Sequence, residues 1–416
     1  MTPDQDGIAE PERRLKPRAR QLWLAAHRWL GLSVGLLFVL LGLTGSLLVF
    51  DHAIDEWLNP DLLLSQAEGA DRSIEEVVAA AEDAHPGNAP AGAVTAPRIE
   101  TGVWTVWFVG GDEKEPEFTA VHVDRRSGEV TGQRVWGEYL MTWVYRLHFQ
   151  LFAGEFGGAL VGVAGVFVIA SLLSGIYLWW PLWKNGWRAA FAVRRGRRLI
   201  YDLHKSVGIF SAALLLAITF TGVYLEFPNV FHGAASWISK TTESPSDLRS
   251  AAPRAGASIS PDEALEIAAR RFPNARFDHL HPPEGDAGVY EVAFRQPDEV
   301  QRSFGRTQVY VDRYTGEVVA VRAPEDFTAA DAFFAWQFPL HNGEAFGLVG
   351  RWVVFFVGLT PAGLYVTGFL LWRRKRLSKR RRRRRRVPNA GADSAAAGPP
   401  FPSDGSLRAE PNVAPR

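Results

Sequence analysis

Four long stretches without a charged residue constrain the fold of this 416-residue chain more than any other feature. They cover residues 30–50, 156–183, 206–225 and 352–372. Each has about 20 residues or more, enough for a helix rising ~1.5 Å per residue to cross a ~30 Å hydrocarbon core. The first stretch is too long for a signal-peptide h-region and lacks an A-x-A-like site after it, so we expect it to remain as an anchor. The sequence thus predicts an α-helical membrane bundle of four transmembrane helices.

Lysine and arginine gather at three places along the chain and orient these helices. They precede the first apolar stretch, fill the link between the second and third, and follow the fourth, where residues 373–386 hold twelve cations in fourteen positions. Because positive residues stay in the cytoplasm, we expect both termini there and segments 51–145 and 228–338 outside. We interpret the arginine-rich tail as a topology anchor with membrane lipids, not nucleic acid, as its partner. The segment after residue 387 is expected to be disordered.

The first half of the chain resembles the second half. At an offset of 177 residues, the first apolar stretch matches the third, with His27 aligned on His204. At an offset of 193, the second matches the fourth, with His148 aligned on His341. The first and third helices would run from the cytoplasm to the outside, and the second and fourth would run back to the cytoplasm. Such an internal duplication gives parallel repeats about an axis along the membrane normal.

The two outer segments also match each other, and each is expected to form a small α+β domain. "VHVDRRSGEV" (121–130) and "VYVDRYTGEV" (309–318) share seven of ten residues. Alternating apolar residues before D-R-x-x-G-E predict a β-hairpin with a short glycine-containing turn. A capping box upstream of each hairpin predicts one helix over each antiparallel sheet. The boxes pair Ser73 with Glu76 and Ser260 with Glu263.

The chain contains no cysteine. Disulfides, cysteine-ligated iron–sulfur clusters, thiolate zinc sites and haem attached through C-x-x-C-H are therefore excluded. Any redox cofactor must be held without a covalent bond to sulfur.

Four of the ten histidines occupy matched positions near the ends of the apolar stretches. His27 and His204, the inner pair, are expected at the cytoplasmic end, and His148 and His341, the outer pair, toward the other side. The repeat would bring each pair together at one depth. Two imidazoles facing each other between helices can ligate a haem iron from both sides. We therefore predict one or two non-covalent haem b groups with these histidines as axial ligands.

Cations and small residues near these histidines favour such a site. Arg28 and Lys205 each follow a histidine of the inner pair and are predicted to bind the haem propionates. Arg146 and Arg351 lie within ten residues of the outer pair. Glycines would leave room for a flat macrocycle between helices, and they occur at Gly31, Gly35, Gly154, Gly157, Gly158 and Gly162.

Other roles for these residues stay open. A histidine at a membrane interface can simply be a polar residue that reaches the headgroups, and glycines in membrane helices often serve close packing alone. His52 or His232, at the outer ends of the first and third helices, could replace an outer ligand. We interpret the remaining histidines as surface residues, and these are His85, His122, His279 and His281.

Several motifs resemble the PepSY-associated transmembrane family over about residues 20–376. They are "HRWLGL…LTGSLL", "LHFQLFAGEFGGALVGVAGVFVIASLLSGIYLWWP", "DLHKSVGIF…TGVYL" and the two VDRxxGEV hairpins. The family includes iron-regulated inner-membrane proteins and ferric-siderophore reductases. The resemblance implies four helices, two periplasmic PepSY-like domains, a bacterial inner-membrane location, and b-type haem bound at His27, His148, His204 and His341. Some relatives carry a fused flavin/NADPH domain, but this chain has no G-x-G-x-x-G motif.

These observations lead to a functional hypothesis with two alternatives. We expect an oxidoreductase of the ferric-siderophore reductase type, which takes electrons from a separate cytoplasmic reductase or a quinol and reduces an Fe(III)-siderophore outside. The first alternative is a membrane-anchored PepSY binding or regulatory module, similar to protease-inhibiting propeptides, without redox activity. The second is a small transporter, but the apolar stretches contain no ionisable Asp, Glu, Lys or Arg for a midplane ion site.

The expected boundaries follow from these features and alternate between the two sides of the membrane. They are a basic N-terminus (1–22), helix 1 (23–51), PepSY-like domain 1 (52–140), an interfacial segment with helix 2 (141–183), a basic loop (184–203), helix 3 (204–227), PepSY-like domain 2 (228–338), an interfacial segment with helix 4 (339–372) and the arginine-rich tail (373–416).

Overall fold

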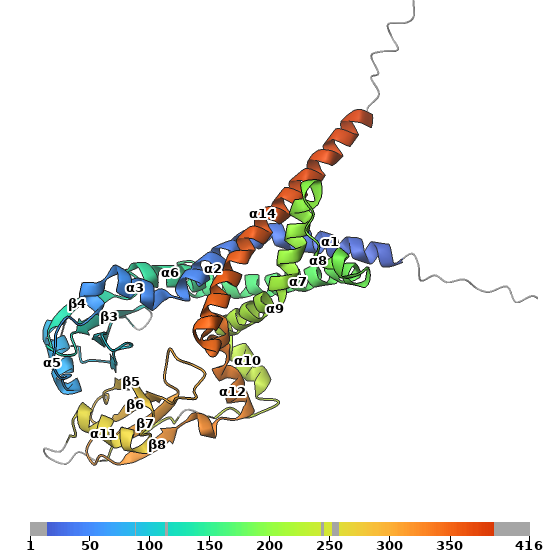
Figure 1. Ribbon diagram of the computed structural model, residues 1–416. Helices are drawn as coiled ribbons and strands as arrows, with labels where there is room; N and C mark the ends of the chain where they lie inside the picture. Colours follow the sequence, from blue (N-terminus) through green and yellow to red (C-terminus); the bar gives the residue numbers. More distant parts are fainter. Residues whose placement is uncertain (1–14, 88, 113–114, 243–244, 252–257, 387–416) are drawn as a thin grey trace, which may run out of the picture. The chain divides into compact units, whose positions relative to one another are not determined.

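The computed structural model describes residues 15–386 apart from 88, 113–114, 243–244 and 252–257 (Figure 1). Most of the expected basic N-terminus and the tail after residue 387 lie outside the described residues. The chain divides into two compact units, residues 1–369 and 370–416. Both pairs of histidines and the sheet belong to the first unit.

Among the described residues, three helices are long and apolar enough to cross a membrane. They are α7 (Gly154–Lys184), α9 (Leu199–Glu226) and α14 (Gly347–Arg386). A fourth candidate consists of two helices, α1 (Leu15–Ser33) and α2 (Gly35–Leu48), which meet at an angle of 55°. The described chain therefore has three candidate spans, or four if the bent pair is one span.

The bend between α1 and α2 differs from the single helix expected over residues 23–51. The hydroxyl of Ser33 donates to the carbonyl of Trp29, at 2.8 Å, and so competes with the helix's own hydrogen bonds. Gly35 follows two residues later and adds backbone freedom. The apolar pattern marks residues 30–50 as a candidate span, and this local competition accounts for the bend within it.

Shorter helices join the long ones to the rest of the chain. They are α3 (Asp51–Leu58), α4 (Pro60–Leu63), α5 (Ile74–Ala84), α6 (Leu140–Gln150), α8 (Trp187–Phe191), η1 (Gly196–Arg198), α10 (Pro228–Ala235), α11 (Pro261–Arg271), η2 (Pro324–Asp326), α12 (Ala329–Ala335), α13 (Gln337–Asn342) and η3 (Glu344–Phe346). Both predicted capping boxes are present, on α5 and α11.

The strands of both outer segments form one eight-stranded antiparallel sheet in the order β4-β3-β2-β1-β5-β6-β7-β8. Two separate sheets were expected, but β1 and β5 pair, with Val94 opposite Leu280, and join them. The strands are β1 (Ala93–Thr95), β2 (Trp104–Asp112), β3 (Glu115–Val123), β4 (Val130–Val135), β5 (Arg276–His281), β6 (Val289–Arg295), β7 (Thr307–Asp312) and β8 (Val318–Arg322).

The two D-R-x-x-G-E motifs form the predicted hairpin turns. The carboxylate of Asp124 accepts from the backbone N–H groups of Arg126 and Ser127, and Asp312 does the same in the second hairpin. Gly128 and Gly316 take positive φ angles of 76° and 70°, which a side chain rarely adopts. The aspartate and glycine therefore define the turn.

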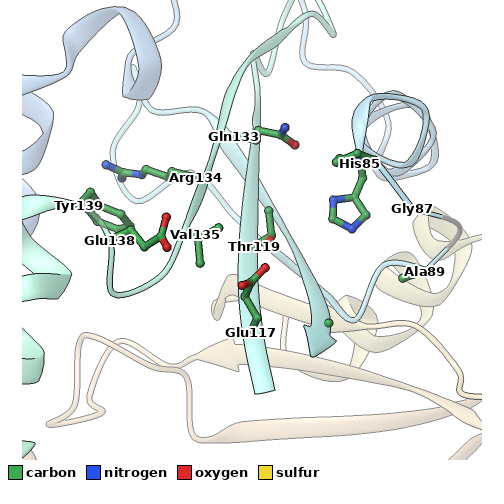
Figure 2. A pocket seen from close by; sticks show the side chains of 12 residues that line it. His85, Gly87, Ala89, Glu117, Thr119, Gln133, Arg134, Val135, Glu138 and Tyr139 are labelled. Carbon is green, nitrogen blue, oxygen red and sulfur yellow. The ribbon is translucent and has the colours of Figure 1, made fainter. Parts of the chain in front are cut away.

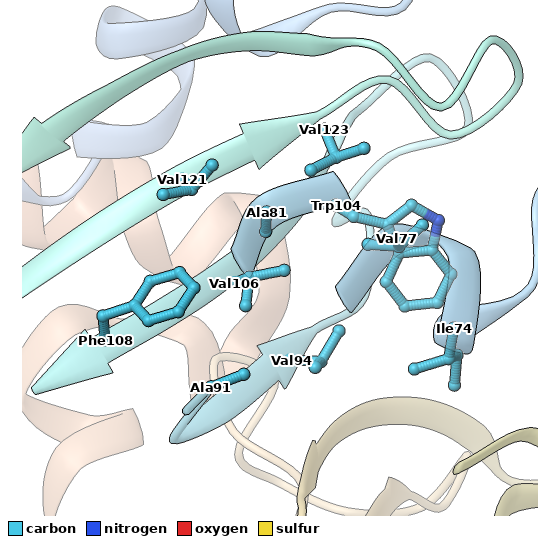
Figure 3. Close-up of a cluster of buried hydrophobic side chains, with 10 residues drawn as sticks. All are labelled: Ile74, Val77, Ala81, Ala91, Val94, Trp104, Val106, Phe108, Val121 and Val123. Carbon is cyan, nitrogen blue, oxygen red and sulfur yellow. The ribbon is translucent and has the colours of Figure 1, made fainter. Parts of the chain in front are cut away.

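Each half of the sheet has its own apolar core under one helix. Figure 3 shows the first core, in which Val77 and Ala81 of α5 lie over Val106, Phe108 and Val121 of the sheet. Ala264 and Ala268 of α11 occupy the second core. Alternation along β2 turns every second residue, Trp104, Val106 and Phe108, into the first core.

Candidate functional site

The four histidines at repeat-matched positions form two pairs. His27 of α1 and His204 of α9 have ring centroids 6.1 Å apart. His148 of α6 and His341 of α13 have ring centroids 6.2 Å apart. These are the partners that the sequence offsets of 177 and 193 predict for the inner and outer pairs.

One ring nitrogen of every histidine in the pairs is held by a hydroxyl on another helix. The four Nδ1–Oγ distances lie between 2.9 and 3.1 Å. They join His27 to Ser174 of α7 (3.0 Å), His148 to Thr44 of α2 (2.9 Å), His204 to Thr367 of α14 (2.9 Å) and His341 to Thr221 of α9 (3.1 Å).

A backbone carbonyl lies beside each of these hydroxyls. Nδ1 of His27 is 3.0 Å from the carbonyl of Ser171, and Nδ1 of His341 is 3.0 Å from that of Ile218. The backbone of Leu41 bonds His148 in the same way, and that of Leu364 bonds His204. Each carbonyl comes three residues before the hydroxyl, because one helical turn brings positions i and i+3 to the same face.

A glycine follows each hydroxyl and makes room for the imidazole. A Cβ on the glycine would lie between 2.9 and 3.3 Å from Cε1 of the histidine ring, a distance tighter than ordinary contacts. The glycines and their rings are Gly175 with His27, Gly45 with His148, Gly368 with His204 and Gly222 with His341. The sequence offsets paired several of these glycines, but their contact with the histidines was not predicted.

The two halves of the chain meet at both pairs. Within each half of the chain, each histidine contacts a hydroxyl and the following glycine on another helix of the same half. Each facing pair then takes one histidine from each half. The inner pair therefore needs α1, α7, α9 and α14, and the outer pair needs α2, α6, α9 and α13.

Comparison with known families gives the chain a class. A family model described as the PepSY-associated TM region matches residues 24–375, which is most of the chain and includes both histidine pairs. The chain belongs to the PepSY-associated transmembrane family. It is thus a membrane protein of the PepSY-associated class. No curated protein matches it.

Two cations were expected beside the inner pair of this family member, and they have different surroundings. Arg28 is half-buried, and its Nε has no hydrogen-bond partner among the residues that the structure describes. Lys205 is buried, and its Nζ donates to the carbonyls of Ala189 and Ala192 at 3.1 Å and lies 3.6 Å from Asp202. Lys205 therefore holds the link after α7, while Arg28 keeps an unused donor.

The cations expected near the outer pair are also placed by the structure. Arg351 donates from Nε to the carbonyl of Val49, at 3.0 Å, and its guanidinium lies over the ring of Phe50. Arg351 thus satisfies a backbone carbonyl at the C-terminal end of α2. Arg146 packs near Gly137.

Several glycines expected to make room for a macrocycle serve helix packing. A Cβ on Gly157 would overlap the carbonyl of Gln150, and one on Gly162 would overlap the ring of Phe227. Gly31 has open space around it. The glycines that contact histidines are those that follow the hydroxyls.

The two histidines named as alternative outer ligands lie in other surroundings. His52 has a side chain 64% exposed beside Asp51. His232 stacks on Phe334 with ring centroids 3.9 Å apart, and its Nε2 is 3.5 Å from the hydroxyl of Tyr224. In the described chain, neither faces another histidine.

The interpretation of His122 as a surface residue is wrong, because its side chain is only 3% exposed. Nε of Arg134 donates to its Nε2 at 3.1 Å, and Nδ1 lies 3.1 Å from the hydroxyl of Thr105. Burial, and to a lesser extent the charge of Arg134, lower the pKa of His122 to about 4. The carboxylate of Asp55 acts in the opposite direction and raises it. Position 122 alternates with the core residues Val121 and Val123, and Arg134 of β4 and Thr105 of β2 hydrogen-bond to it on the other face of the sheet.

The other histidines expected at the surface have mixed exposure. His281 is exposed, and its Nδ1 lies 3.0 Å from the carbonyl of Gly92. His279 is half-buried beside Asp278. His85 is half-buried and stacks on Phe108 with ring centroids 4.1 Å apart.

A cleft of about 800 Å³ opens on the sheet of this family member, beyond the end of α5. Figure 2 shows the side chains of Glu117, Glu138 and His85 around it, with Arg134 and Tyr139 at one side. Its volume is within the range of small-molecule sites. Tyr139 directly precedes α6, the helix that carries His148.

Proposed function

We propose that this protein is an inner-membrane b-type haem protein that carries electrons across the bilayer to an outer acceptor, an Fe(III)-siderophore. One observation carries this proposal. Two pairs of histidines face each other, with Nδ1 of each ring bound to a neighbouring helix. In the described chain, no group hydrogen-bonds to Nε2 of these four rings, so Nε2 is left for a ligand role.

The separation within each pair suits a metal bound between the rings. Two metal–imidazole bonds of about 2 Å place the ligating nitrogens about 4 Å apart, and each ring adds roughly 1 Å to its centroid. The resulting separation of about 6 Å agrees with the centroid distances of 6.1 and 6.2 Å. The separation within each pair would therefore allow His27 with His204, and His148 with His341, to hold one metal between them.

The donor set favours haem over a bare metal ion. Among the described residues, no group of three or more His, Asp or Glu side chains gathers where it could hold a metal. A bare ion at either pair would thus have two protein ligands, fewer than structural sites use. A porphyrin supplies the missing equatorial nitrogens, and the absence of cysteine requires non-covalent attachment.

The buried Nε of Arg28 supports an anionic group at the inner pair. An unpartnered guanidinium donor is costly inside a membrane protein, and a haem propionate would supply its acceptor. Lys205 is less suited to this role because two carbonyls and Asp202 already surround its Nζ. We therefore assign the propionate contact to Arg28.

The arrangement we infer for the chain has four crossings and two related halves. The bent pair α1–α2 would be the first crossing, and both termini would be cytoplasmic, because the basic segments flank the same ends of the helices. The halves would be parallel repeats, each with one PepSY-like unit outside. On α9, His204 and the hydroxyl that holds His341 are 17 residues apart, a rise of about 25 Å.

Bound haem would supply a one-electron centre at each pair, with a potential set by its axial ligands and surroundings. The protein residues hold the rings, place one pair toward each membrane face and exclude water with apolar helices. Electrons would enter from a separate cytoplasmic reductase or a membrane quinol. Outside, reduction of the acceptor releases the metal, because Fe(II) binds hard oxygen chelators much more weakly than Fe(III).

The cleft beyond α5 is a candidate site for the outer acceptor. Its wall residue Tyr139 is nine positions before His148, about 14 Å along a helix. A ligand in this cleft would thus lie near the helix that carries one outer histidine. This connection supports the outer pair as the point of electron exit.

An absorption spectrum of detergent-purified protein tests the proposal. We expect sharp b-type bands after dithionite and about two haems per chain. One haem per chain would leave the outer pair without this role, and the inner pair should then lose its haem in His27→Ala and His204→Ala. A colourless protein from haem-replete cells would reject electron transfer and favour the PepSY binding module.

The acceptor is tested by reoxidation of the dithionite-reduced protein. Anaerobic mixing with a ferric trihydroxamate should oxidise the haem bands and produce Fe(II), detected by a ferrous chelator. The gallium(III) complex of the same ligand is the control, because it has a similar shape and cannot accept the electron. Equal rates with and without the ferric complex would contradict the proposed acceptor class.

A further inference from the structure

A hydroxyl–glycine dipeptide occurs once in each of the four long apolar stretches. The dipeptides are Thr44–Gly45, Ser174–Gly175, Thr221–Gly222 and Thr367–Gly368. Each holds one histidine of the two pairs, with the hydroxyl at Nδ1 and the glycine under Cε1. Packing alone would explain the glycines but not a hydroxyl beside every ring.

The hydrogen bonds around the hydroxyls determine which ring nitrogen carries the proton. Thr367 donates its single hydroxyl proton to the carbonyl of Gly363, at 2.7 Å, and so can only accept from His204. The other three hydroxyls also donate to a carbonyl of their own helix, at 2.6 to 2.8 Å. For His27 and His341, a carbonyl beside Nδ1 independently requires Nδ1 to be the donor.

We infer that Thr44, Ser174, Thr221 and Thr367 are positioning residues that hold all four histidines as the Nδ1–H tautomer. In this tautomer Nε2 of each ring carries the free lone pair, and the ring centroids of each pair are 6.1 and 6.2 Å apart. Which nitrogen of a histidine binds a metal is set by the hydrogen bond that the other nitrogen makes. The hydroxyl at Nδ1 therefore leaves Nε2 as the metal ligand. This inference rests on the proposed function for its consequence at haem, but not for the tautomer itself.

Each hydroxyl should also affect the electronic character of its ligand. An acceptor at Nδ1–H increases the basicity of the ligating nitrogen and fixes the ring orientation. A more basic imidazole stabilises the ferric state, so removal of the hydroxyl should raise the midpoint potential of that haem. Loss of such a partner typically costs about 10- to 100-fold in metal affinity.

The tautomer is tested without haem. The full chain is expressed in a haem-deficient host with ¹⁵N-labelled histidine, and four single His→Gln variants assign the ring signals. We expect protonated Nδ1 and unprotonated Nε2 at positions 27, 148, 204 and 341. Protonated Nε2 at these positions would overturn the inference, whatever the haem content of the wild type.

The role at haem is tested with a matched series on α14. Thr367→Val removes the acceptor with little change of shape, Thr367→Ser keeps it, and Thr360→Val is the control. Thr360 donates to its own helix at Val357, as Thr367 does at Gly363, but contacts no histidine. We expect Thr367→Val alone to weaken haem binding about 10- to 100-fold and raise one of two potentials. Its low-spin EPR signal should also change.

Two results of this series would overturn the positioning role. In the first, Thr367→Val and Thr360→Val behave alike. In the second, Thr367→Ser loses as much haem as Thr367→Val. Thr44→Val should shift the other potential, because it serves the outer pair. A wild type without haem would reject the proposed function, and the nitrogen signals would still decide the tautomer.

Discussion

Asp55 and Arg134 form a buried, two-pronged ion pair between a helix and the sheet. Nη1 of Arg134 donates to Oδ1 of Asp55 at 3.0 Å, and Nη2 donates to Oδ2 at 2.6 Å. The side chain of Arg134 is 15% exposed and that of Asp55 is 11% exposed. Asp55 lies on α3, which begins three residues after α2 ends, so the pair connects the first candidate span to β4. The position of the sheet at the end of this span depends on two complementary charges.

Replacing Asp55 by Asn should destabilise the protein strongly. The guanidinium of Arg134 would stay buried beside His122 without its counter-charge, and such a change costs about 3 to 5 kcal/mol. Thermal unfolding of the detergent-purified protein measures the loss. Glu56→Gln is the control, because its partner Arg98 is 42% exposed and surface pairs contribute about 1 kcal/mol or less. Similar losses in both variants would contradict the importance of the buried pair.

His122 should make stability fall as the solution becomes acidic. Its pKa is about 4 in the folded protein and 6.5 in the unfolded chain, so the unfolded chain takes up the proton first. The contribution is full above pH 6.5 and is lost progressively as the pH falls to about 4. A difference of about 2.5 pKa units corresponds to roughly 3 kcal/mol.

The measurement for His122 is a series of melting temperatures from pH 7.5 to 4. His122→Gln cannot be protonated in this range, so the decline should be less steep in the variant than in the wild type. Comparison of the two curves removes the contributions of the other titrating groups, which both proteins share. Parallel curves would show that His122 does not titrate on unfolding.

Features that depend on short stretches of sequence could be predicted. Capping boxes and D-R-x-x-G-E turns are satisfied by backbone groups within a few residues, so their pattern specifies their geometry. The histidine pairs depend on a longer relation, but matched offsets in two halves provide it. His27 and His204, which the offset of 177 aligns, have ring centroids 6.1 Å apart.

Features that depend on contacts between distant segments could not be predicted. Nothing near Val94 indicates that β1 pairs with β5 and joins two sheets into one. His122 alternates like a solvent-facing residue, yet it is buried and bound by Arg134 and Thr105 on neighbouring strands. The hydroxyl–glycine dipeptides were visible in the sequence, but their role needed the positions of the histidines on neighbouring helices.

The glycine after each hydroxyl should be more sensitive to substitution than glycines elsewhere in the same span. Gly45→Ala would place a Cβ 2.9 Å from Cε1 of His148 and push the ring from its position. Gly31→Ala meets no atom within 4 Å and should be neutral or slightly stabilising, because alanine favours helix by up to ~1 kcal/mol. Haem per folded chain should therefore fall in Gly45→Ala and stay unchanged in Gly31→Ala. Equal haem content in the two variants would mean that the glycine does not shape the site.

Arg28 and Lys205 should differ in what they contribute to the inner pair. Lys205→Met leaves the carbonyls of Ala189 and Ala192 without their donor, at a cost of about 1 to 3 kcal/mol for each buried group. The melting temperature should fall, while haem per folded chain stays at the wild-type value.

Arg28→Gln should show the opposite pattern. Its Nε has no hydrogen-bond partner within the described residues, and the guanidinium otherwise lies over the ring of its neighbour Trp29, so the substitution should change the melting temperature of the haem-free protein little. Haem at the inner pair should dissociate faster, because a propionate loses its cation, and Arg28→Lys should restore part of the affinity. Dissociation is followed by haem transfer to an apo-globin acceptor. If Lys205→Met releases haem and Arg28→Gln does not, the propionate contact belongs to Lys205.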